Sequence, residues 1–518
     1  MKKMAVIKTI LLTALLFLFV EGFAAKAKNE TRTTERQTYS QRIASAPGKT
    51  LYVDMTQADI TITGEGQNDI VADATVELSD RNPELVKEFL AQTNLVLEPY
   101  RQGFRVTLKS PRDKFSRRSD SGFRRLMNLI FEGNTEGFSM STALRLRVPS
   151  NQSLTIENKY GDITIENING ALEVDNTSGQ IVIERCQGSL NVQNNYAATE
   201  IKDFQGSIAV QNNSGAVALF NVTGDAKVGS SYKSVRFDKI GGALTIDAQS
   251  SEVSGAGVQG DCNITSSYKP ISVSRIGGRL TVRGQSSAVT ASDIRQDVLI
   301  ESSYQPIRVD SVGGGLKIIA QSSPVTVNVV AKEVSILTSY QTISVQQVGG
   351  MLTIDGNSCE VTASEVKRDA TIRSSYKTIR VENVGGNLSV DGSSCSVMAD
   401  GVGGNVEVAN SYKYVVLKRT AGSIEVRGDS SPIEVSQIAR LPANGRINLI
   451  TTYKPVTLAL PASAAVQISA RTQYGKIRSD FPVYLNTDDD GKAVKMTLGT
   501  GDAVVRVETS GDIILRKE

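Results

Sequence analysis

The sequence contains no histidine and no tryptophan, and only 5% of its 518 residues are aromatic. Without histidine, imidazole cannot serve as a base, as an activator of a nucleophile or as a metal ligand. His-dependent catalytic triads, HExxH zinc proteases and His-bearing zinc fingers are therefore excluded. Enzymes that use only carboxylates remain compatible with the composition.

Long hydrophobic runs are also scarce, since a single one stands out, over residues 10–20 (ILLTALLFLFV), after a lysine pair at the N-terminus. Three alanines follow between residues 24 and 27. This layout is typical of a cleaved secretory signal peptide, and eleven residues are few for spanning a bilayer. We expect a signal peptide over residues 1–27, with an uncleaved anchor as the alternative, and a flexible linker over 28–49. The protein would be exported, to the periplasm, the cell surface or the medium.

Basic and acidic residues nearly balance along the chain, except in one segment. The net charge is +3, and residues 111–125 carry six basic residues against two acidic ones. A chain that is close to neutral elsewhere does not predict nucleic-acid binding. The segment 111–137 interrupts the surrounding pattern, and it could contact an anionic membrane or a partner. The favoured alternative is a loop with a short cap helix. The candidate contact residues are Arg112, Lys114, Arg117, Arg118, Arg124, Arg125 and Phe131.

A repeat runs through most of the chain. Eight tyrosines recur at intervals of 36 residues, and a serine stands midway after each of them, so the underlying period is 18 over sixteen units. We number each unit from its tyrosine or serine as position 0. The tyrosines are Tyr160, Tyr196, Tyr232, Tyr268, Tyr304, Tyr340, Tyr376 and Tyr412.

Each unit reads as two short strands. Apolar residues recur at positions 3, 5 and 8 and again at 12 and 14, and position 10 is glycine in twelve of the sixteen units. Period-two runs bounded by glycine, serine or asparagine predict strands. Such a unit is stable only when stacked, so we predict an all-β single-chain parallel β-helix with 18 residues per rung. Sixteen rungs give a rod of roughly 75–80 Å.

The hand of the coil follows from weaker signals. Parallel crossovers favour right-handed connections, and the apolar spacing departs from the hexapeptide period of left-handed β-helices, so we expect a right-handed coil. Glycine at position 10 fits a corner that needs positive φ or a close backbone approach. The regular rungs cover residues 148–440. Residues 50–147 form an N-terminal α+β cap with first rungs and a helix over 83–92, and residues 441–518 form C-terminal rungs and a cap.

The tyrosines have two interpretations. Position 0 shares its parity with the core positions 12, 14 and 16, which favours inward tyrosines that alternate with serine so that the ladder fills without strain. The alternative is an exposed aromatic strip that stacks on sugars, with Lys or Gln beside six of the tyrosines as a polar rim.

Two further residue types bear on chemistry. Cys186 and Cys262 differ in phase, whereas Cys359 and Cys395 lie two rungs apart, about 9.6 Å, which exceeds the span of a disulfide. We expect four free, mostly buried thiols. Acidic residues share no common phase, so neither a pair of catalytic carboxylates nor a metal or cofactor site is predicted.

The motif (L/I)-x-(V/I)-x-x-S-x-x-x-(I/V)-x-V, closing on a Gly-Gly corner, and Gly-Asp-Ile at residues 161–163 and 511–513 resemble the exported bacterial β-strand repeat proteins labelled "putative adhesin", a domain of unknown function. The resemblance covers residues 50–518, implies a β-helical cell-envelope protein and brings no catalytic residue. The period is also similar to that of bactofilins, but the export signal and the 36-residue interval argue against them.

We therefore expect a non-enzymatic cell-envelope protein, either an adhesin or another surface binding or structural protein. The alternatives are a self-assembling scaffold, an envelope-stress or membrane-contact protein and, least favoured, a polysaccharide-active enzyme. A glycan or a cell-surface protein is the expected partner, with peripheral membrane contact as a further option and the oligomeric state left open.

Overall fold

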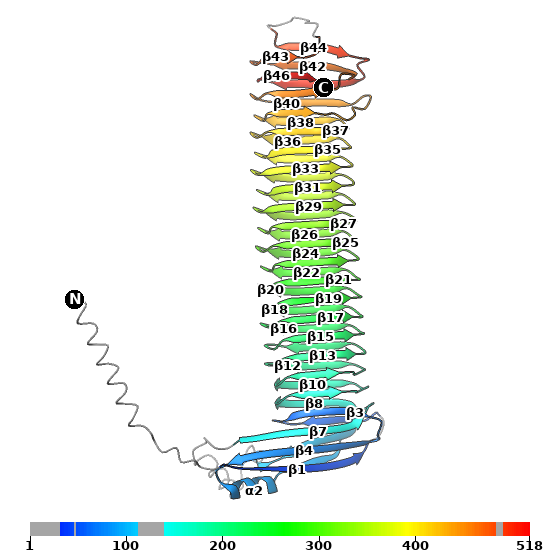
Figure 1. Cartoon of the computed structure of the whole chain (residues 1–518), viewed down its shortest axis with the longest axis vertical. Coiled ribbons are helices and arrows are strands. Elements are labelled where there is room, and N and C mark those ends of the chain that lie inside the picture. Colours follow the sequence, from blue (N-terminus) through cyan, green and yellow to red (C-terminus); the bar gives the residue numbers. More distant parts are fainter. Residues whose placement is uncertain (1–31, 46–47, 112–138, 483–490) are drawn as a thin grey trace, which may run out of the picture.

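The chain folds into a rod of stacked rungs (Figure 1). The computed structural model describes residues 32–45, 48–111, 139–482 and 491–518. Each rung holds two strands joined by a corner, and each strand pairs with the equivalent strands of the neighbouring rungs, so that two long sheets face each other. The predicted all-β, single-chain β-helix is confirmed, and its hand stays a prediction.

The first sheet consists of β1 (Thr33–Ala44), β3 (Asp59–Glu65), β4 (Asp69–Asp80), β7 (Ser139–Pro149), β9 (Ile163–Glu166), β11 (Ile181–Glu184), β13 (Thr199–Phe204), β15 (Val217–Val222), β17 (Val235–Ile240), β19 (Val253–Val258), β21 (Ile271–Ile276), β23 (Val289–Ile294), β25 (Ile307–Val312), β27 (Val325–Val330), β29 (Thr342–Val348), β31 (Glu360–Val366), β33 (Thr378–Val384), β35 (Ser396–Val402), β37 (Val415–Thr420), β39 (Ile433–Ser436), β41 (Val456–Leu460), β43 (Ile477–Ser479) and β46 (Ile513–Lys517).

The second sheet consists of β2 (Thr50–Asp54), β5 (Asn94–Tyr100), β6 (Gly103–Lys109), β8 (Ser153–Tyr160), β10 (Leu172–Ser178), β12 (Leu190–Asn194), β14 (Ile208–Asn212), β16 (Ala226–Ser231), β18 (Leu244–Gln249), β20 (Cys262–Ser267), β22 (Leu280–Gln285), β24 (Val298–Ser303), β26 (Leu316–Gln321), β28 (Val334–Ser339), β30 (Leu352–Asn357), β32 (Ala370–Ser375), β34 (Leu388–Ser393), β36 (Val406–Ser411), β38 (Ile424–Asp429), β40 (Arg446–Thr451), β42 (Val466–Thr472), β44 (Ala493–Leu498) and β45 (Ala503–Thr509).

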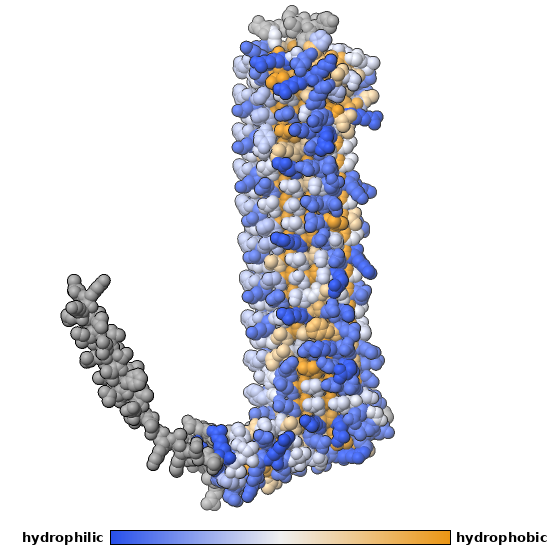
Figure 2. Space-filling model, in the orientation of Figure 1, coloured by the Kyte–Doolittle hydropathy of each residue, from blue (hydrophilic) through white to orange (hydrophobic). Residues whose placement is uncertain are grey.

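The register follows the sequence period. In β18 and β20, Ile246 lies directly beside Ile264, eighteen residues later. Both side chains are 1% exposed, as expected for like residues that stack between the two sheets. Hydrophilic residues line the borders of the face shown in Figure 2, and hydrophobic residues are visible between them. Apolar ladders between the sheets therefore form the core along the rod.

Each regular strand of the first sheet contains a residue in the left-handed backbone conformation, at or just beyond its end in the shortest strands. Position 7 has a φ between 44° and 78° in all sixteen units, although only Gly257 and Gly401 are glycines there. In most of these strands the left-handed residue is left out of the pairing while the residues on both sides of it pair with the next strand, as in a bulge that bends the strand locally. The glycines at position 10 mostly serve close approach, since a Cβ on Gly242 would lie 2.7 Å from the amide nitrogen of Asp225.

The N-terminal end carries a broad foot below the rungs (Figure 1). β4 pairs antiparallel with β7, and β1 pairs antiparallel with β4 along all twelve of its residues. The predicted linker over 28–49 is therefore wrong for Thr33–Ala44. The residues there are mostly polar, and backbone pairing with β4, together with packing of Tyr39 and Ile43 against the cores, holds the strand.

One helix, α2 (Pro83–Ala91), lies within the range predicted as helical. Proline occupies the start of the helix, where no intrahelical donor is needed. The Asn82 side chain accepts hydrogen bonds from the Glu84 and Leu85 amides. Phe89 and Leu90 are buried on a small satellite core that β4 completes.

Axial order and sequence order differ at both ends. The rung β2–β3 lies between β6–β7 and β8–β9, because β2 pairs with both β6 and β8 and β3 pairs with both β7 and β9. The rung β45–β46 likewise lies between β40–β41 and β42–β43. β44 then pairs antiparallel with β42. Near each end, one rung therefore lies between two rungs that are not its neighbours in sequence order.

Candidate functional site

The predicted tyrosines face solvent. Their exposed fractions run from 54% at Tyr160 to 69% at Tyr232 and Tyr376, so the favoured interpretation of inward packing is wrong. From Tyr232 onward, every residue at position 0 has a φ between 52° and 68°. A left-handed residue breaks the strict two-residue alternation of side chains on which the parity argument relied.

Two further tyrosines join the column. Val456 lies beside both Ile433 and Ile513, and Ile477 lies beside Ile513. This register places Tyr453 next to Ser430, Ser510 next to Tyr453, and Tyr474 next to Ser510. Tyrosine and serine therefore continue to alternate in space although the sequence spacing is lost. Sequence reasoning missed this because it assumed that order along the chain is order along the rod.

We call the ten exposed residues at this corner the tyrosine stripe. They are Tyr160, Tyr196, Tyr232, Tyr268, Tyr304, Tyr340, Tyr376, Tyr412, Tyr453 and Tyr474, exposed by 54–71%. Eighteen rung steps separate the first from the last in the strand pairing, which at about 4.8 Å per step gives about 86 Å. The stripe follows nearly the whole rod.

The chemistry of this corner alternates from rung to rung. In a rung with a tyrosine corner, the residue two before the tyrosine is polar and is buried, or half-buried in the case of Ser302. Ser266 is an example, and its hydroxyl donates to the carbonyl of Ser251 in the preceding rung at 2.8 Å. Ser302, Ser374 and Asn410 make the same bond in their own rungs. This side chain fills the corner and satisfies a carbonyl there.

In a rung with a serine corner, the residue after the serine fills the corner instead. Ser287 and Cys359 are fully buried at this place. The residue two before the serine is then small, because a Cβ on Gly356 would lie 3.0 Å from the Cys359 Cβ. The two-rung period is therefore explained by two kinds of small side chain that fill the interior of the corner in alternate rungs. The tyrosine ring does not contribute to this filling.

The first rungs use another corner. Asn158, Asn176, Asn194 and Asn212 are stacked, buried and bonded through Nδ2 to backbone carbonyls, as with Asn194 to the Gly179 carbonyl at 3.1 Å. Tyr160 and Tyr196 stand at these corners and have no positive φ. They are exposed all the same, so tyrosine is present on both kinds of corner.

Polar side chains surround each ring. The residue after the tyrosine is exposed and is Lys or Gln in seven rungs, namely Lys233, Lys269, Gln305, Gln341, Lys377, Lys413 and Lys454. Between the rings lie the partly buried serines at position 0, each preceded in most rungs by an exposed Gln or Asn such as Gln285. The stripe therefore presents aromatic faces separated by hydroxyl, amide and ammonium groups.

The backbone beneath the rings is held by hydrogen bonds between rungs. The amide of Tyr268 donates to the Gln285 carbonyl at 2.9 Å, and that of Tyr304 donates to the Gln321 carbonyl at 2.8 Å. Tyr340, Tyr376 and Tyr412 make the equivalent bond. The Cα positions of the stripe are thus fixed relative to one another before any ligand binds.

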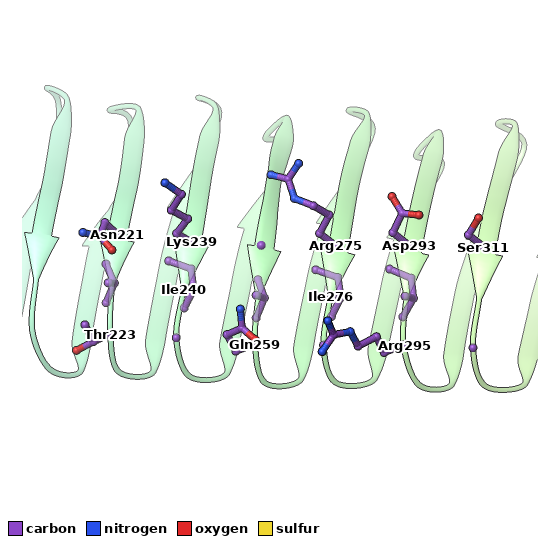
Figure 3. A pocket seen from close by; sticks show the side chains of 17 residues that line it. Asn221, Thr223, Lys239, Ile240, Gln259, Arg275, Ile276, Asp293, Arg295 and Ser311 are labelled. Carbon is purple, nitrogen blue, oxygen red and sulfur yellow. The ribbon is translucent and has the colours of Figure 1, made fainter.

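The opposite edge carries a shallow groove of about 870 Å³, shown in Figure 3. Its floor contains Ile240 and Ile276, and one row of its rim holds Lys239, Arg275 and Asp293 (Figure 3). Arg275 is paired with Asp238 at 3.4 Å. Equivalent positions of the rim hold basic, acidic and neutral residues in different rungs, whereas the stripe repeats tyrosine at a constant interval.

The four cysteines are buried and free. Burial raises the pKa of the Cys262 thiol to about 12, and it also raises the pKa of Cys186, Cys359 and Cys395. A protonated thiol is a poor nucleophile. Cys359 and Cys395 occupy the corner place that Ser251, Ser287 and Ser323 hold in other rungs, which explains their identical phase.

Other predicted residues are placed as follows. The basic segment with Arg112, Lys114, Arg117, Arg118, Arg124, Arg125 and Phe131 lies outside the described residues, as does the predicted signal peptide. Among the described residues, no cluster of three or more Cys, Asp or Glu side chains is suited to a metal ion. In the same part of the chain, no helix combines the length and apolar character needed to cross a membrane.

Comparisons with known proteins bear mainly on the fold. A crystal structure described as a "putative cell adhesion protein" from Clostridium sporogenes ATCC 15579 is similar at 7% identity, covering 93% of this chain and 100% of that chain, with a TM-score of 0.14. No curated protein matches the chain. Residues 49–267 match the family model described as Toastrack DUF4097. This match agrees with the predicted resemblance to a family of β-solenoid domains of unknown function.

Proposed function

We propose that the protein is a non-enzymatic surface protein of the cell envelope that holds an extended ligand along the tyrosine stripe, as an adhesin does. The observation that carries this proposal is the stripe itself, ten tyrosines that are 54–71% exposed at one corner of the rod. Tyrosine is a preferred contact residue because its ring offers a large, rigid surface at a low cost in conformational entropy, and serine and asparagine beside it supply adaptable hydrogen bonds.

The energetics of the corner support a role outside folding. A non-glycine residue in the left-handed region costs about 1–2 kcal/mol, and asparagine or glycine adopts it more readily. Serine occupies the same place at φ 52–59° in alternate rungs, so the fold accepts a small side chain there. Large rings that fill no corner and face solvent are therefore best explained by an external partner.

Placement at the envelope rests on the sequence of residues 1–27, whose layout is typical of an export signal. Expression of the full chain in a bacterial host, followed by fractionation, tests this step. We expect the mature protein outside the cytoplasm and a cytoplasmic product when residues 1–27 are deleted. A full-length product that stays in the cytoplasm unprocessed would contradict the localisation.

The binding role is tested with the fluorescently labelled full chain on intact bacterial cells and on isolated cell walls. The variant carries Tyr268→Ser, Tyr304→Ser and Tyr340→Ser, a change to the residue that alternate rungs already hold. The matched control carries Lys239→Ser, Arg275→Ser and Asp293→Ser, three exposed residues of the opposite edge. We expect the tyrosine variant to lose most of the bound label and the control to retain it. Equal binding by all three proteins would overturn the proposal.

The alternative of an end-to-end scaffold finds less support. Within the described residues, antiparallel strands continue the stack at both ends, β4 and β1 at the foot and β44 on β42. The outer strand of the foot, β1, is mostly polar and carries the exposed Arg36 and Arg42, and charged residues on an edge strand discourage pairing with another copy. Scattering at high concentration is the test, and we expect monodisperse particles rather than filaments.

A further inference from the structure

The spacing of the tyrosine stripe restricts the ligand. Neighbouring tyrosines lie two rungs apart, which is about 9.6 Å along the rod. The interval is set by backbone hydrogen bonds between rungs and is the same from Tyr160 to Tyr474. A ligand that contacts many tyrosines at once must therefore offer equivalent apolar faces at this interval.

We propose, resting on the function above, that the stripe binds a linear β-1,4-linked glycan, with every second sugar ring stacked on a tyrosine. In an extended chain of this linkage each pyranose is about as long as one rung, and successive rings are turned over, so that alternate rings present the same face. The two-ring period of the glycan is then close to the two-rung period of the stripe.

Other polymers match less well. An extended peptide rises about 3.3 Å per residue, so its same-face side chains recur at about 6.6 Å and lose register with the tyrosines. Single-stranded nucleic acid also stacks on aromatic rings, but it needs a positive channel for its phosphates. The charge here is +3 over the whole chain, and acidic Glu252 and Glu360 border the same corner.

The groups between the tyrosines suit sugar hydroxyls. A ring over a serine rung would lie above a partly buried hydroxyl such as Ser286, next to the exposed amide of Gln285. The neighbouring ring would stack on Tyr268 or Tyr304 with Lys269 or Gln305 at its edge. Hydroxyls, amides and ammonium groups together provide donors and acceptors for an uncharged polyol.

A second copy of the chain is a poorer occupant of the stripe. Lysine follows the tyrosine in five rungs, at Lys233, Lys269, Lys377, Lys413 and Lys454. Two stripes pressed together would bring these rows of like charge into one interface, and like charges that face each other oppose association. A neutral polymer meets no such repulsion.

The arrangement predicts a strong dependence of affinity on ligand length. Each tyrosine is a single, open contact, so a disaccharide should bind weakly. A longer chain engages further tyrosines without a second association cost, so the gain should continue over several tyrosines. A ligand confined to one pocket would stop gaining after a few rings.

The test measures binding of cello-oligosaccharides and chito-oligosaccharides of increasing length to the full chain by calorimetry. Maltooligosaccharides of the same lengths, whose α-1,4 linkage curves the chain, are the matched control ligands. We expect affinity to rise about tenfold or more across the first series and to stay low across the second. The variant with Tyr268→Ser, Tyr304→Ser and Tyr340→Ser should lose most of the gain for long ligands. The matched control with Lys239→Ser, Arg275→Ser and Asp293→Ser, three exposed residues of the opposite edge, should change it little.

Three results would overturn the inference: no binding of either β-1,4 series, equal binding of the α-1,4 series, or affinity that does not grow with length. If the tyrosine variant loses binding to cells while no oligosaccharide binds, the inference fails and the proposed function stands. If cell binding does not depend on the tyrosines, the proposed function itself fails. Tyrosine-dependent dimerisation in ultracentrifugation would assign the stripe to a second copy and reject the glycan.

Discussion

Replacement of a stripe tyrosine by asparagine should affect stability differently at the two kinds of corner. Tyr232 has a φ of 68°, whereas Tyr196, at an asparagine corner, has no positive φ. Their exposed fractions are 69% and 68%, so both substitutions remove a similar, small amount of ring contact. The difference between the two variants therefore isolates the backbone strain.

The expected difference is about 1 kcal/mol, because asparagine tolerates the left-handed region that tyrosine adopts at a cost of about 1–2 kcal/mol. Relative to Tyr196→Asn, the Tyr232→Asn variant should be the more stable one. Neither should approach the 2–5 kcal/mol lost when a core aliphatic residue such as Ile264 is truncated to alanine.

The full chain is the material for the assay. Urea unfolding followed by far-UV circular dichroism gives the overall change, but a long array of rungs does not have to unfold in a single step. Hydrogen exchange of the rung amides gives the local opening free energy. The amide of residue 232 donates to the Gln249 carbonyl. Relative to the unmodified protein, the exchange rate of this amide in Tyr232→Asn should be about fivefold lower than the exchange rate near residue 196 in Tyr196→Asn. Equal effects at both sites, or a larger loss for Tyr232→Asn, would refute the argument that the rings serve no structural purpose.

Other predictions follow from particular contacts. Val329 is 44% exposed at a φ of 44°, and Val329→Asn should raise the free energy of unfolding by about 1 kcal/mol in urea titrations. Gly356→Ala should lower it by about 1–3 kcal/mol, because the new Cβ would lie 3.0 Å from the Cys359 Cβ, while Cys359→Ser should change it by less than about 1 kcal/mol. Burial raises the pKa of Cys262 from 9.0 to about 12, so its contribution to stability is complete below about pH 9 and is lost as the pH rises toward 12. Urea midpoints measured between pH 9 and 12 should therefore fall as the pH rises. At neutral pH the buried Cys262 thiol should react with a maleimide only after the protein unfolds. Deletion of residues 503–518 removes the rung between β40–β41 and β42–β43, so hydrogen exchange should show loss of protection throughout β42 and β44.

The rungs could be predicted because stacking leaves a strict record in the sequence. Equivalent side chains share a ladder, so an insertion in one rung would displace the register of every later strand. This is why Ile246 could be paired with Ile264, and why Cys359 and Cys395 could be placed in one phase. The start of α2 was visible for a local reason, a proline at the beginning of an amphipathic run.

The direction of the tyrosines could not be predicted by counting. Parity along a strand holds only while the backbone stays extended, and the left-handed residue at position 0 ends that regularity. Position 7 has the same conformation with Lys239, Asp293 or Val329. Unlike glycine, these residues give no sequence signal for a left-handed backbone. The corner filling by Ser266 and Ser287 involves neighbouring rungs and becomes evident only when the rungs are placed together.

The amino-acid sequence by itself determined the period, the two strands of each rung, the apolar ladders and the regular interval of the tyrosines, because these depend on contacts between residues at a constant separation. Only the tertiary structure decided which way the rings point, that Thr33–Ala44 form a strand, and that Tyr453 and Tyr474 complete the stripe. Those features depend on backbone dihedral angles at the corners and on rungs that insert out of order, so the residues that must meet are separated by no constant distance along the chain.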